Sequence, residues 1–336
     1  MYTKREILSK IQTESFLIGI LHLIGLLSLC RDDDKKRGRP YLYPTVVILR
    51  CYVVRIWFRI PSNNCLHRYF SIDGTHHRKV ARACGLDMLP DRRTFDRRFK
   101  ILPLQDVIGT MGLRFVTEQL ACGSIVSVDS SMIRAKNGHI WHRKQMIQGT
   151  IPRSGIDTDA RWGFSATKGW QYGYKLHICC TTGSIVVPLA AAVTSANVYD
   201  NQLYHTIIEQ LPYGIRYVVA DAGYDDWKLY DYTRQRGARL VCPIRRYRHT
   251  KGPRLDLISF YKSRKGQQVY GTRSVSIEPL FQCIKETFGI SSVPVIGFEN
   301  VSSYLLMCVF VYQITVYYNC IVGKDKPRCI RYMLGN

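Results

Sequence analysis

The stretch YVVADAGYDDW, residues 217–227, is an apolar run that ends in Asp221. Such a run predicts a strand that crosses a hydrophobic core. An ionised carboxylate at its end is costly unless a cation compensates it, so Asp221 is a candidate functional residue. The alternative is that Asp221 only caps the following turn. Gly223 would let the backbone turn sharply after the carboxylate, and Asp225 and Asp226 are interpreted as the acidic start of a helix.

A second stretch, SIVSVDSSMI (residues 124–133), places Asp129 in an apolar run in the same way. The neighbouring Ser130 and Ser131 are interpreted as structural and not as nucleophiles. Two predicted strands thus each deliver one carboxylate. The order of the elements around them decides whether these carboxylates meet.

From Gly123 onward the pattern predicts three strands, a helix, a strand, a helix and a strand. The second and third strands (172–182 and 184–195) are separated by a turn and suggest a hairpin. This order is typical of a ribonuclease-H-like α/β domain with a mixed five-stranded sheet. The first and fourth strands are adjacent in that architecture, so Asp129 and Asp221 are expected to project into one place.

Residues 1–122 are predicted to be mostly helical, with helices in 5–16, 16–30 and 45–60 and another after Pro90. Arg50, Arg55 and Arg59, spaced by five and four residues, are expected to line one basic flank of a helix. Asp91 or Thr94 is expected to cap the helix after Pro90. The chain is therefore divided into a helical N-terminal region (1–122), an α/β domain (123–322) and a basic tail (323–336); the charge and the resemblance described below imply DNA binding by the first and catalysis by the second.

Charge indicates the class of partner. The chain holds 48 Lys and Arg against 25 Asp and Glu, a formal net charge of +23. The excess is spread over both halves, and a globular protein this basic usually faces a polyanion. The alternative is a solvated basic surface.

Cysteine usage and apolar runs indicate the compartment. The twelve cysteines include no C-x-x-C pair, which is typical of buried thiols in a reducing compartment. The apolar runs 16–30 and 304–318 are short for a membrane span and predict buried helices. We therefore expect a cytoplasmic, nucleoid-associated protein and no membrane.

Two carboxylates hold a divalent cation only loosely, so a third is expected further along the chain. The run 270–289 predicts a helix that carries Glu278 and, seven residues later on the same face, Lys285. A carboxylate and an ammonium on one face suit a helix packed over an active site. The alternative is an ordinary amphipathic helix with solvated charges.

These residues together resemble the DDE transposases of prokaryotic insertion sequences. The run Asp221-Ala-Gly-Tyr-Asp is similar to the family's second-Asp motif, and Tyr270-x2-Arg273-x4-Glu278-x6-Lys285 resembles its Tyr-Arg-Glu-Lys signature. The family has three residues between the Arg and the Glu, whereas this chain has four. The runs 89–99, 167–177 and 194–200 also resemble family text, and the likeness covers roughly residues 40–320.

The resemblance implies metal-dependent hydrolysis at a transposon end, followed by attack of the freed 3′-hydroxyl on target DNA. It implies Asp129, Asp221 and Glu278 as catalytic ligands of two Mg²⁺ ions, with Mn²⁺ able to substitute. Tyr270, Arg273 and Lys285 are implied as phosphate contacts. The expected partner is double-stranded DNA, as terminal inverted repeats and target, and pairing of two ends makes a homodimer the expected assembly. An inactive transposase-derived DNA-binding protein and a ribonuclease-H-like nuclease are the alternatives.

Three weaker features complete the pattern. Lys168, Trp170 and Lys175 mix basic and aromatic residues and suit DNA backbone and unstacked bases, although alternate residues of a strand there would be core. The run KKRGRP (35–40) is similar to a minor-groove-inserting core, but a basic loop is the simpler interpretation. The run HIWH (139–142) has metal-like spacing, and a basic loop is again the simpler interpretation.

Overall fold

The computed structural model describes residues 15–30, 41–139, 142–149, 155–165, 168–212, 214–244 and 252–331. The basic stretch 35–40, the predicted helix 5–16 up to residue 14, the centre of HIWH and the last five residues lie outside these ranges. The α-helices are α2 (Phe16–Leu26), α3 (Thr45–Trp57), α4 (Asn63–Ser71), α5 (Thr75–Cys84), α6 (Arg92–Lys100), α7 (Leu104–Thr117), α8 (Arg143–Ile147), α9 (Tyr204–Glu209), α10 (Trp227–Gln235), α11 (Pro253–Lys262), α12 (Arg264–Gly271), α13 (Ile277–Phe288) and α14 (Phe298–Ile321). The strands are β1 (Ile125–Arg134), β2 (Arg161–Ser165), β3 (Gly169–Thr181), β4 (Pro188–Ser195), β5 (Tyr217–Val219) and β6 (Arg239–Val241), and two short 3₁₀ helices are η1 (Asp200–Leu203) and η2 (Ala222–Tyr224).

The strands form one mixed, six-stranded sheet. β1 pairs antiparallel with β3 and parallel with β5, and β6 pairs parallel with β5. β4 folds back on the second half of β3 as the predicted hairpin, whereas β2 pairs with its first half. The predicted adjacency of the first and fourth strands is confirmed by β1 and β5. The prediction of five strands is wrong by one, because β2 is only five residues long and pairs with residues 169–173 of β3, which overlap the predicted strand only at its first two positions.

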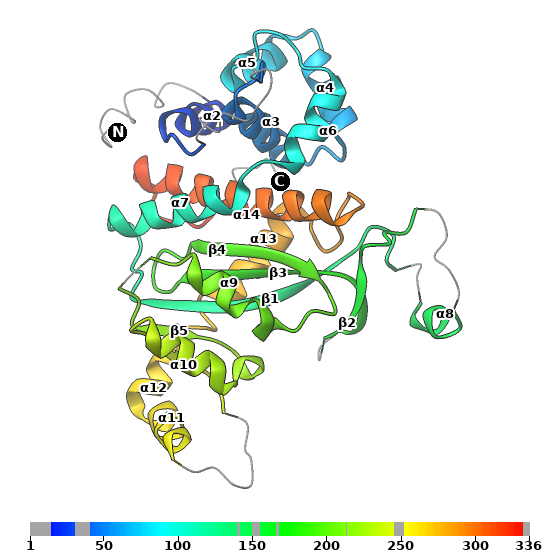
Figure 1. The fold of residues 1–336 in the computed structure, drawn as a ribbon. Coiled ribbons are helices and arrows are strands. Elements are labelled where there is room, and N and C mark those ends of the chain that lie inside the picture. Colours follow the sequence, from blue (N-terminus) through cyan, green and yellow to red (C-terminus); the bar gives the residue numbers. More distant parts are fainter. Residues whose placement is uncertain are drawn as a thin grey trace.

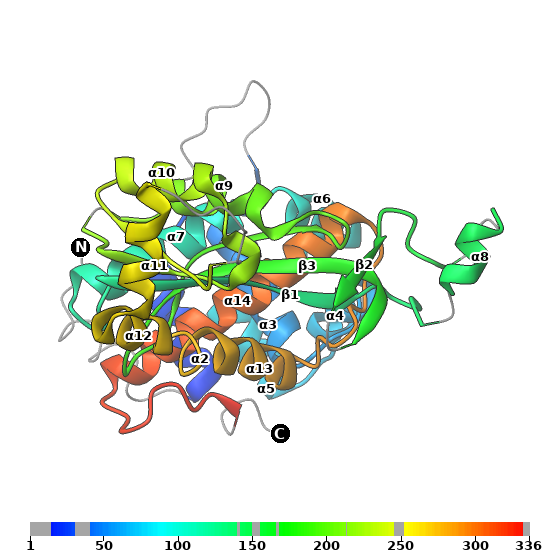
Figure 2. The ribbon, with the colours of Figure 1, turned by 90° about the horizontal axis from the view of Figure 1, so that it is seen from below.

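The sheet separates two hydrophobic cores, because the side chains of a strand alternate between its faces. Ile133 and Leu176 belong to the larger core, which includes α7, α13 and α14. Val126 and Val128 belong to the smaller core, with α9 and α10. Figure 1 shows α7 and α14 running across the sheet on the side of the N-terminal helices, with α10 on the opposite side. Figure 2 shows α12 and α13 in succession along one side of β1.

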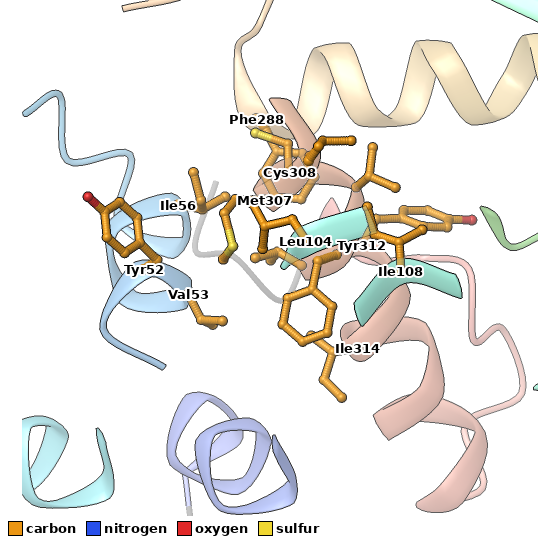
Figure 3. Packing of buried hydrophobic residues seen from close by; sticks show 14 of the residues in the cluster. Tyr52, Val53, Ile56, Leu104, Ile108, Phe288, Met307, Cys308, Tyr312 and Ile314 are labelled. Carbon is orange, nitrogen blue, oxygen red and sulfur yellow. The ribbon is translucent and has the colours of Figure 1, made fainter. Parts of the chain in front are cut away.

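The helix α14 joins the N-terminal helices to the sheet. It contacts α2, α3, α6 and α7 on one side and β4 on the other. The Gln313 amide donates to the carbonyl of Ile108 on α7 and to that of Pro188 on β4, at 3.0 and 2.8 Å. Figure 3 shows how side chains of α3, α7, α13 and α14 meet there: Tyr52, Val53, Ile56, Leu104, Ile108, Phe288, Met307, Cys308, Tyr312 and Ile314.

Among the described residues, α14 alone is long and apolar enough to cross a membrane by length and composition. It spans 24 residues, more than the predicted apolar run 304–318. Buried residues make up 94% of its most apolar window, and this burial inside the protein is typical of a core helix.

Local details of the helices agree only in part with the sequence predictions. Asp91 caps α6 as predicted, and Asp226 caps α10. Asp225 does not start that helix, because its carboxylate is buried against the guanidinium of Arg254 at 2.6 Å. Arg55 is not on a basic flank: it is 2% exposed and donates to the carbonyl oxygens of the segment after α3.

Candidate active site

Asp129 lies in the middle of β1, where this strand continues beyond the end of its short neighbour β5. Its Oδ1 accepts a hydrogen bond from the backbone amide of Ser130 at 2.8 Å. Its side chain is 15% exposed. The strand therefore presents a single carboxylate at the point where the sheet narrows.

Asp221 lies two residues after β5 and is the N-cap of η2. Its Oδ1 accepts from the backbone amide of Gly223 at 2.8 Å, so the turn-capping interpretation describes one of its two oxygens. A Cβ atom on Gly223 would come within 2.9 Å of that same oxygen. Gly223 is thus needed because of the close approach of the carboxylate and not, as predicted, for an unusual backbone turn, since its φ is not in the left-handed region.

Asp129 and Asp221 line one cavity of about 350 Å³. Three lysines, Lys168, Lys175 and Lys285, line it as well. The cavity therefore combines carboxylates able to bind cations with ammonium groups able to bind anions. This pairing suits a reacting group that carries negative charge.

The cavity perturbs the ionisation of Asp129. Burial raises the pKa of Asp129 to about 6, while Arg273 opposes the rise and the nearby charge of Asp221 adds to it. A further cation near Asp129 would stabilise its ionised form, because Arg273 only partly offsets the cost of burying this charge.

Glu278 approaches Asp129 from α13, whose first turn contains it. The two carboxylates are joined through Arg273, whose Nη1 lies 2.5 Å from Glu278 Oε1 and whose Nη2 lies 2.5 Å from Asp129 Oδ2. The predicted helix 270–289 is broken between α12 and α13, and Arg273 lies in that turn. The guanidinium of Arg273 therefore lies between the carboxylates of Glu278 and Asp129.

Tyr270 and Lys285 are close enough to act on the charges of the bridge, Tyr270 with Arg273 and Lys285 with Asp129. Tyr270 is the penultimate residue of α12, and burial raises the pKa of its hydroxyl. Lys285 Nζ donates to the carbonyl of Met132 on β1 at 3.0 Å. Burial lowers the pKa of Lys285 to about 8, with Lys168 adding to the effect and Asp129 opposing it.

Trp170 lies on the exposed face of β3 next to a second cavity of about 760 Å³. Its ring packs edge-on against Phe164 of β2, and the guanidinium carbon of Arg143 lies 3.8 Å from its centroid. Phe164 and Trp170 are exposed, whereas Tyr172, two positions further along and on the same face of β3, is buried, so the exposed part of this face is confined to the start of the strand. The second cavity shares Phe164 and Lys175 with the carboxylate cavity.

Asp200 was not predicted. It lines both cavities, and its Oδ1 lies 2.9 Å from Lys175 Nζ. Asp200 is the last residue of the run TSANVYD (194–200), which resembles family text. A carboxylate at the start of a helix is common, however, so its position alone does not indicate a functional residue. The ion pair means that Lys175 is held by a carboxylate and by the carbonyl of Val198.

Within the part of the chain that the structure describes, no group of three or more His, Cys, Asp or Glu side chains is placed to hold one metal ion. His139 and His142 form no such group there. The donor chemistry of Asp129, Asp221 and Glu278 suits Mg²⁺, but Arg273 lies between two of the three.

Comparisons with known proteins identify the family. A model of the transposase DDE domain matches residues 120–314, more than half of the chain. The chain is also similar to a solved structure, the cryo-EM structure of a piggyBac transposase synaptic complex with hairpin DNA. The identity is 10% and the TM-score 0.41, over 99% of this chain and 80% of that one. No curated protein matches the sequence. The family match covers both Asp129 and Asp221 together with Glu278, and on this ground the chain belongs to the family of DDE-domain transposases.

Proposed function

We propose that this protein hydrolyses DNA at the ends of its transposon and joins the freed 3′-hydroxyl to target DNA. A water oxygen attacks phosphorus at the transposon end and displaces the 3′-oxygen, which leaves as a hydroxyl. That hydroxyl then attacks phosphorus in the target strand and displaces the 3′-oxygen there. The observation that carries the proposal is the convergence of Asp129 and Asp221, from adjacent strands, on one lysine-lined cavity.

The proposed cofactors are two Mg²⁺ ions, for which Mn²⁺ would substitute. Asp129, Asp221 and Glu278 would hold them, because carboxylate oxygens are the ligands that Mg²⁺ prefers. When bound, such ions activate the attacking oxygen and neutralise charge on the leaving oxygen. Glu278 would complete the set after Arg273 has released it.

The DNA strand would enter along the cationic side of the cavity. Lys168 and Lys285 line it, and Arg273 reaches its carboxylate Asp129. Tyr270, Arg273 and Lys285 would contact DNA phosphates. Lys175, which forms an ion pair with Asp200, would shape the wall that the two cavities share. Trp170 and Phe164 offer exposed rings on which an unstacked base would lie.

The remaining features extend this proposal to the whole chain. The sheet order supports a ribonuclease-H-like domain over 123–322. The run from Tyr270 to Lys285 supports the prokaryotic branch with the Tyr-Arg-Glu-Lys signature. Exposed basic side chains on α5 and α6 support DNA binding by 1–122: Arg78, Lys79, Arg82, Arg92, Arg93 and Arg97. A homodimer would pair two terminal inverted repeats, in the cytoplasm and on the nucleoid, with 323–336 as a basic tail.

The experiment is metal-dependent nicking of a duplex that carries the transposon ends. Asp221→Asn should lose nicking in Mg²⁺ and Mn²⁺ but keep DNA binding, because its amide oxygen still caps η2. Asp226→Asn is the matched control, since Asp226 caps α10 in the same way and lies outside the cavity. Equal nicking by the two variants would show that Asp221 is only a cap.

Two further outcomes separate the alternatives. DNA binding without nicking by the parent protein would indicate an inactive descendant. Nicking without joining to target DNA would indicate a nuclease.

A further inference from the structure

Arg273 makes an unusual bridge between two acids from different elements. Its two terminal nitrogens bind one oxygen each of Asp129 on β1 and Glu278 on α13, both at 2.5 Å. A guanidinium more often grips a single carboxylate with both nitrogens. Here one cation is shared between two carboxylates, as a bridging metal ion would be.

The bridge is sheltered at one end and open at the other. The side chains of Arg273 and Asp129 are each 15% exposed, whereas that of Glu278 is 53% exposed. The Asp129 half is therefore stronger than an ordinary surface ion pair, because solvent screens it little. The Glu278 half remains accessible to a competing cation or anion from solution.

The charges at the bridge do not balance. A single positive charge on Arg273 faces Asp129 and Glu278, and Asp221 is close enough to act on both Asp129 and Arg273. The Nε–H of Arg273 is also buried without a hydrogen-bond partner in the described chain. Lys168 and Lys285 in the adjoining cavity add positive charge nearby, but one donor of Arg273 remains unused.

We propose that Arg273 is an internal cation that closes the metal site of the DNA-free protein and is released when a DNA phosphate binds its guanidinium. The inference rests on the proposed function. Asp129 and Glu278 would hold a metal ion through oxygens that Arg273 now binds, so the two cations would exclude each other. A phosphate at the cavity mouth, near Lys168 and Lys285, offers Arg273 a new partner with the fork geometry that guanidinium prefers.

The position of Arg273 in the chain permits this exchange. It lies in the turn between α12 and α13, where its carbonyl accepts from the amides of Ser276 and Ile277 at 3.2 Å. Its backbone is thus fixed by the start of α13, while its side chain reaches Asp129, which lines the cavity. By linkage, whatever DNA does to metal affinity, metal does equally to DNA affinity.

The test measures Mn²⁺ binding to the DNA-free protein from the free-ion electron paramagnetic resonance signal. Arg273→Gln should bind Mn²⁺ roughly 5–150-fold more tightly than the parent, the usual range of coupling between two sites. Arg234→Gln is the matched control, because it removes a surface Arg–Asp pair and should leave affinity unchanged. Asp129→Asn supplies the background of binding elsewhere. Parental or weaker affinity in Arg273→Gln would overturn the proposal.

Arg273→Lys keeps the test decisive should the Gln variant fail to fold by circular dichroism. Lysine retains the charge but not the fork that holds two carboxylates, so Mn²⁺ affinity should again rise, by less. Parental affinity in that variant would also overturn the proposal.

A second measurement adds a short duplex, with Asp129→Asn used to subtract Mn²⁺ bound by the DNA itself. The duplex should raise the affinity of the parent and not that of Arg273→Gln; an equal rise in both would contradict release by phosphate. Nicking assays judge the proposed function independently. If the parent nicks DNA but Arg273→Gln gains no affinity for Mn²⁺, this inference alone is refuted. If the parent does not nick DNA but Arg273→Gln binds Mn²⁺ more tightly, only the proposed function is refuted.

Discussion

At the scale of single residues, the site places Asp129 where its ionisation costs stability. Burial raises the pKa of Asp129 to about 6, from an unfolded value of 3.8. An acid whose pKa is raised by folding stabilises the fold when protonated, and this stability is lost as pH rises through the folded pKa. The proposed metal binding requires Asp129 to be ionised, and this ionisation lowers the stability of the fold.

Asp129→Asn should consequently stabilise the metal-free protein. A rise of about two pKa units corresponds to roughly 3 kcal/mol at pH 7.5, because each unit is worth about 1.4 kcal/mol. The free energy of unfolding, measured with denaturant in a chelator, should be higher in the variant. The difference should shrink as pH falls through 6 and should vanish only below 3.8, where Asp129 is protonated in both states. A variant less stable than the parent at pH 7.5 would show that the ion pair with Arg273 outweighs burial.

Lys285 should make DNA binding depend on pH. Its pKa of about 8 means that it loses its proton, and with it the proposed phosphate contact, between pH 7 and 9. The slope of log affinity against log salt should be smaller at pH 9 than at pH 7 by about one unit. Lys285→Arg stays charged over this range and should keep the pH 7 slope. The same change of slope in both proteins would assign the effect to another group.

Asp129 and Asp221 were predictable from sequence because an apolar strand that ends in a carboxylate is a local pattern. The bridge by Arg273 was not, since it joins residues 144 positions apart through a turn inside a segment predicted as one helix. Arg55 shows the same limit: its spacing suggests a surface, but the carbonyl groups that satisfy it lie beyond the end of its helix.

At the scale of elements, the order of strands and helices predicted the core of the sheet. A hairpin and a parallel pair follow from turn signals and alternation, and both are present as β3–β4 and β1–β5. The break between α12 and α13 and the strand β2 were missed. Both depend on which partner a short segment packs against, and a local pattern does not contain that information.

The packing of α7 on the sheet gives a prediction of opposite sign at two glycines. A Cβ atom on Gly112 would lie 2.8 Å from the Cα of Leu189 on β4, whereas one on Gly109 meets nothing within 4 Å. Gly112→Ala should therefore destabilise the protein by about 1–3 kcal/mol, because backbone of the sheet must move. Gly109→Ala should stabilise it by up to about 1 kcal/mol through helix propensity. Thermal unfolding of both variants tests this, and a stable Gly112→Ala would show that α7 does not approach β4 so closely.

At the scale of the whole molecule, the last helix completes the core of the first ones. The sequence showed α14 as apolar on all sides, which predicts burial but not the partner. In the structure α14 packs against α3, α7 and the sheet, so residues separated by some 250 positions share one core. The N-terminal helices and the sheet are therefore expected to be coupled energetically, although their proposed roles differ.

This coupling predicts cooperative unfolding, which hydrogen exchange measured by mass spectrometry can test. Met307 is fully buried on α14, and Met307→Ala should cost about 2–5 kcal/mol through the lost contacts and the cavity left behind. Because α14 packs against both the N-terminal helices and the sheet, the free energy of opening should fall by the same amount in peptides from α3 and in peptides from β1. Ile72→Ala, which truncates an exposed side chain beside α4, is the control and should change neither. If α3 loses protection while β1 keeps it, the helices open on their own and the shared core does not couple them to the active-site strand.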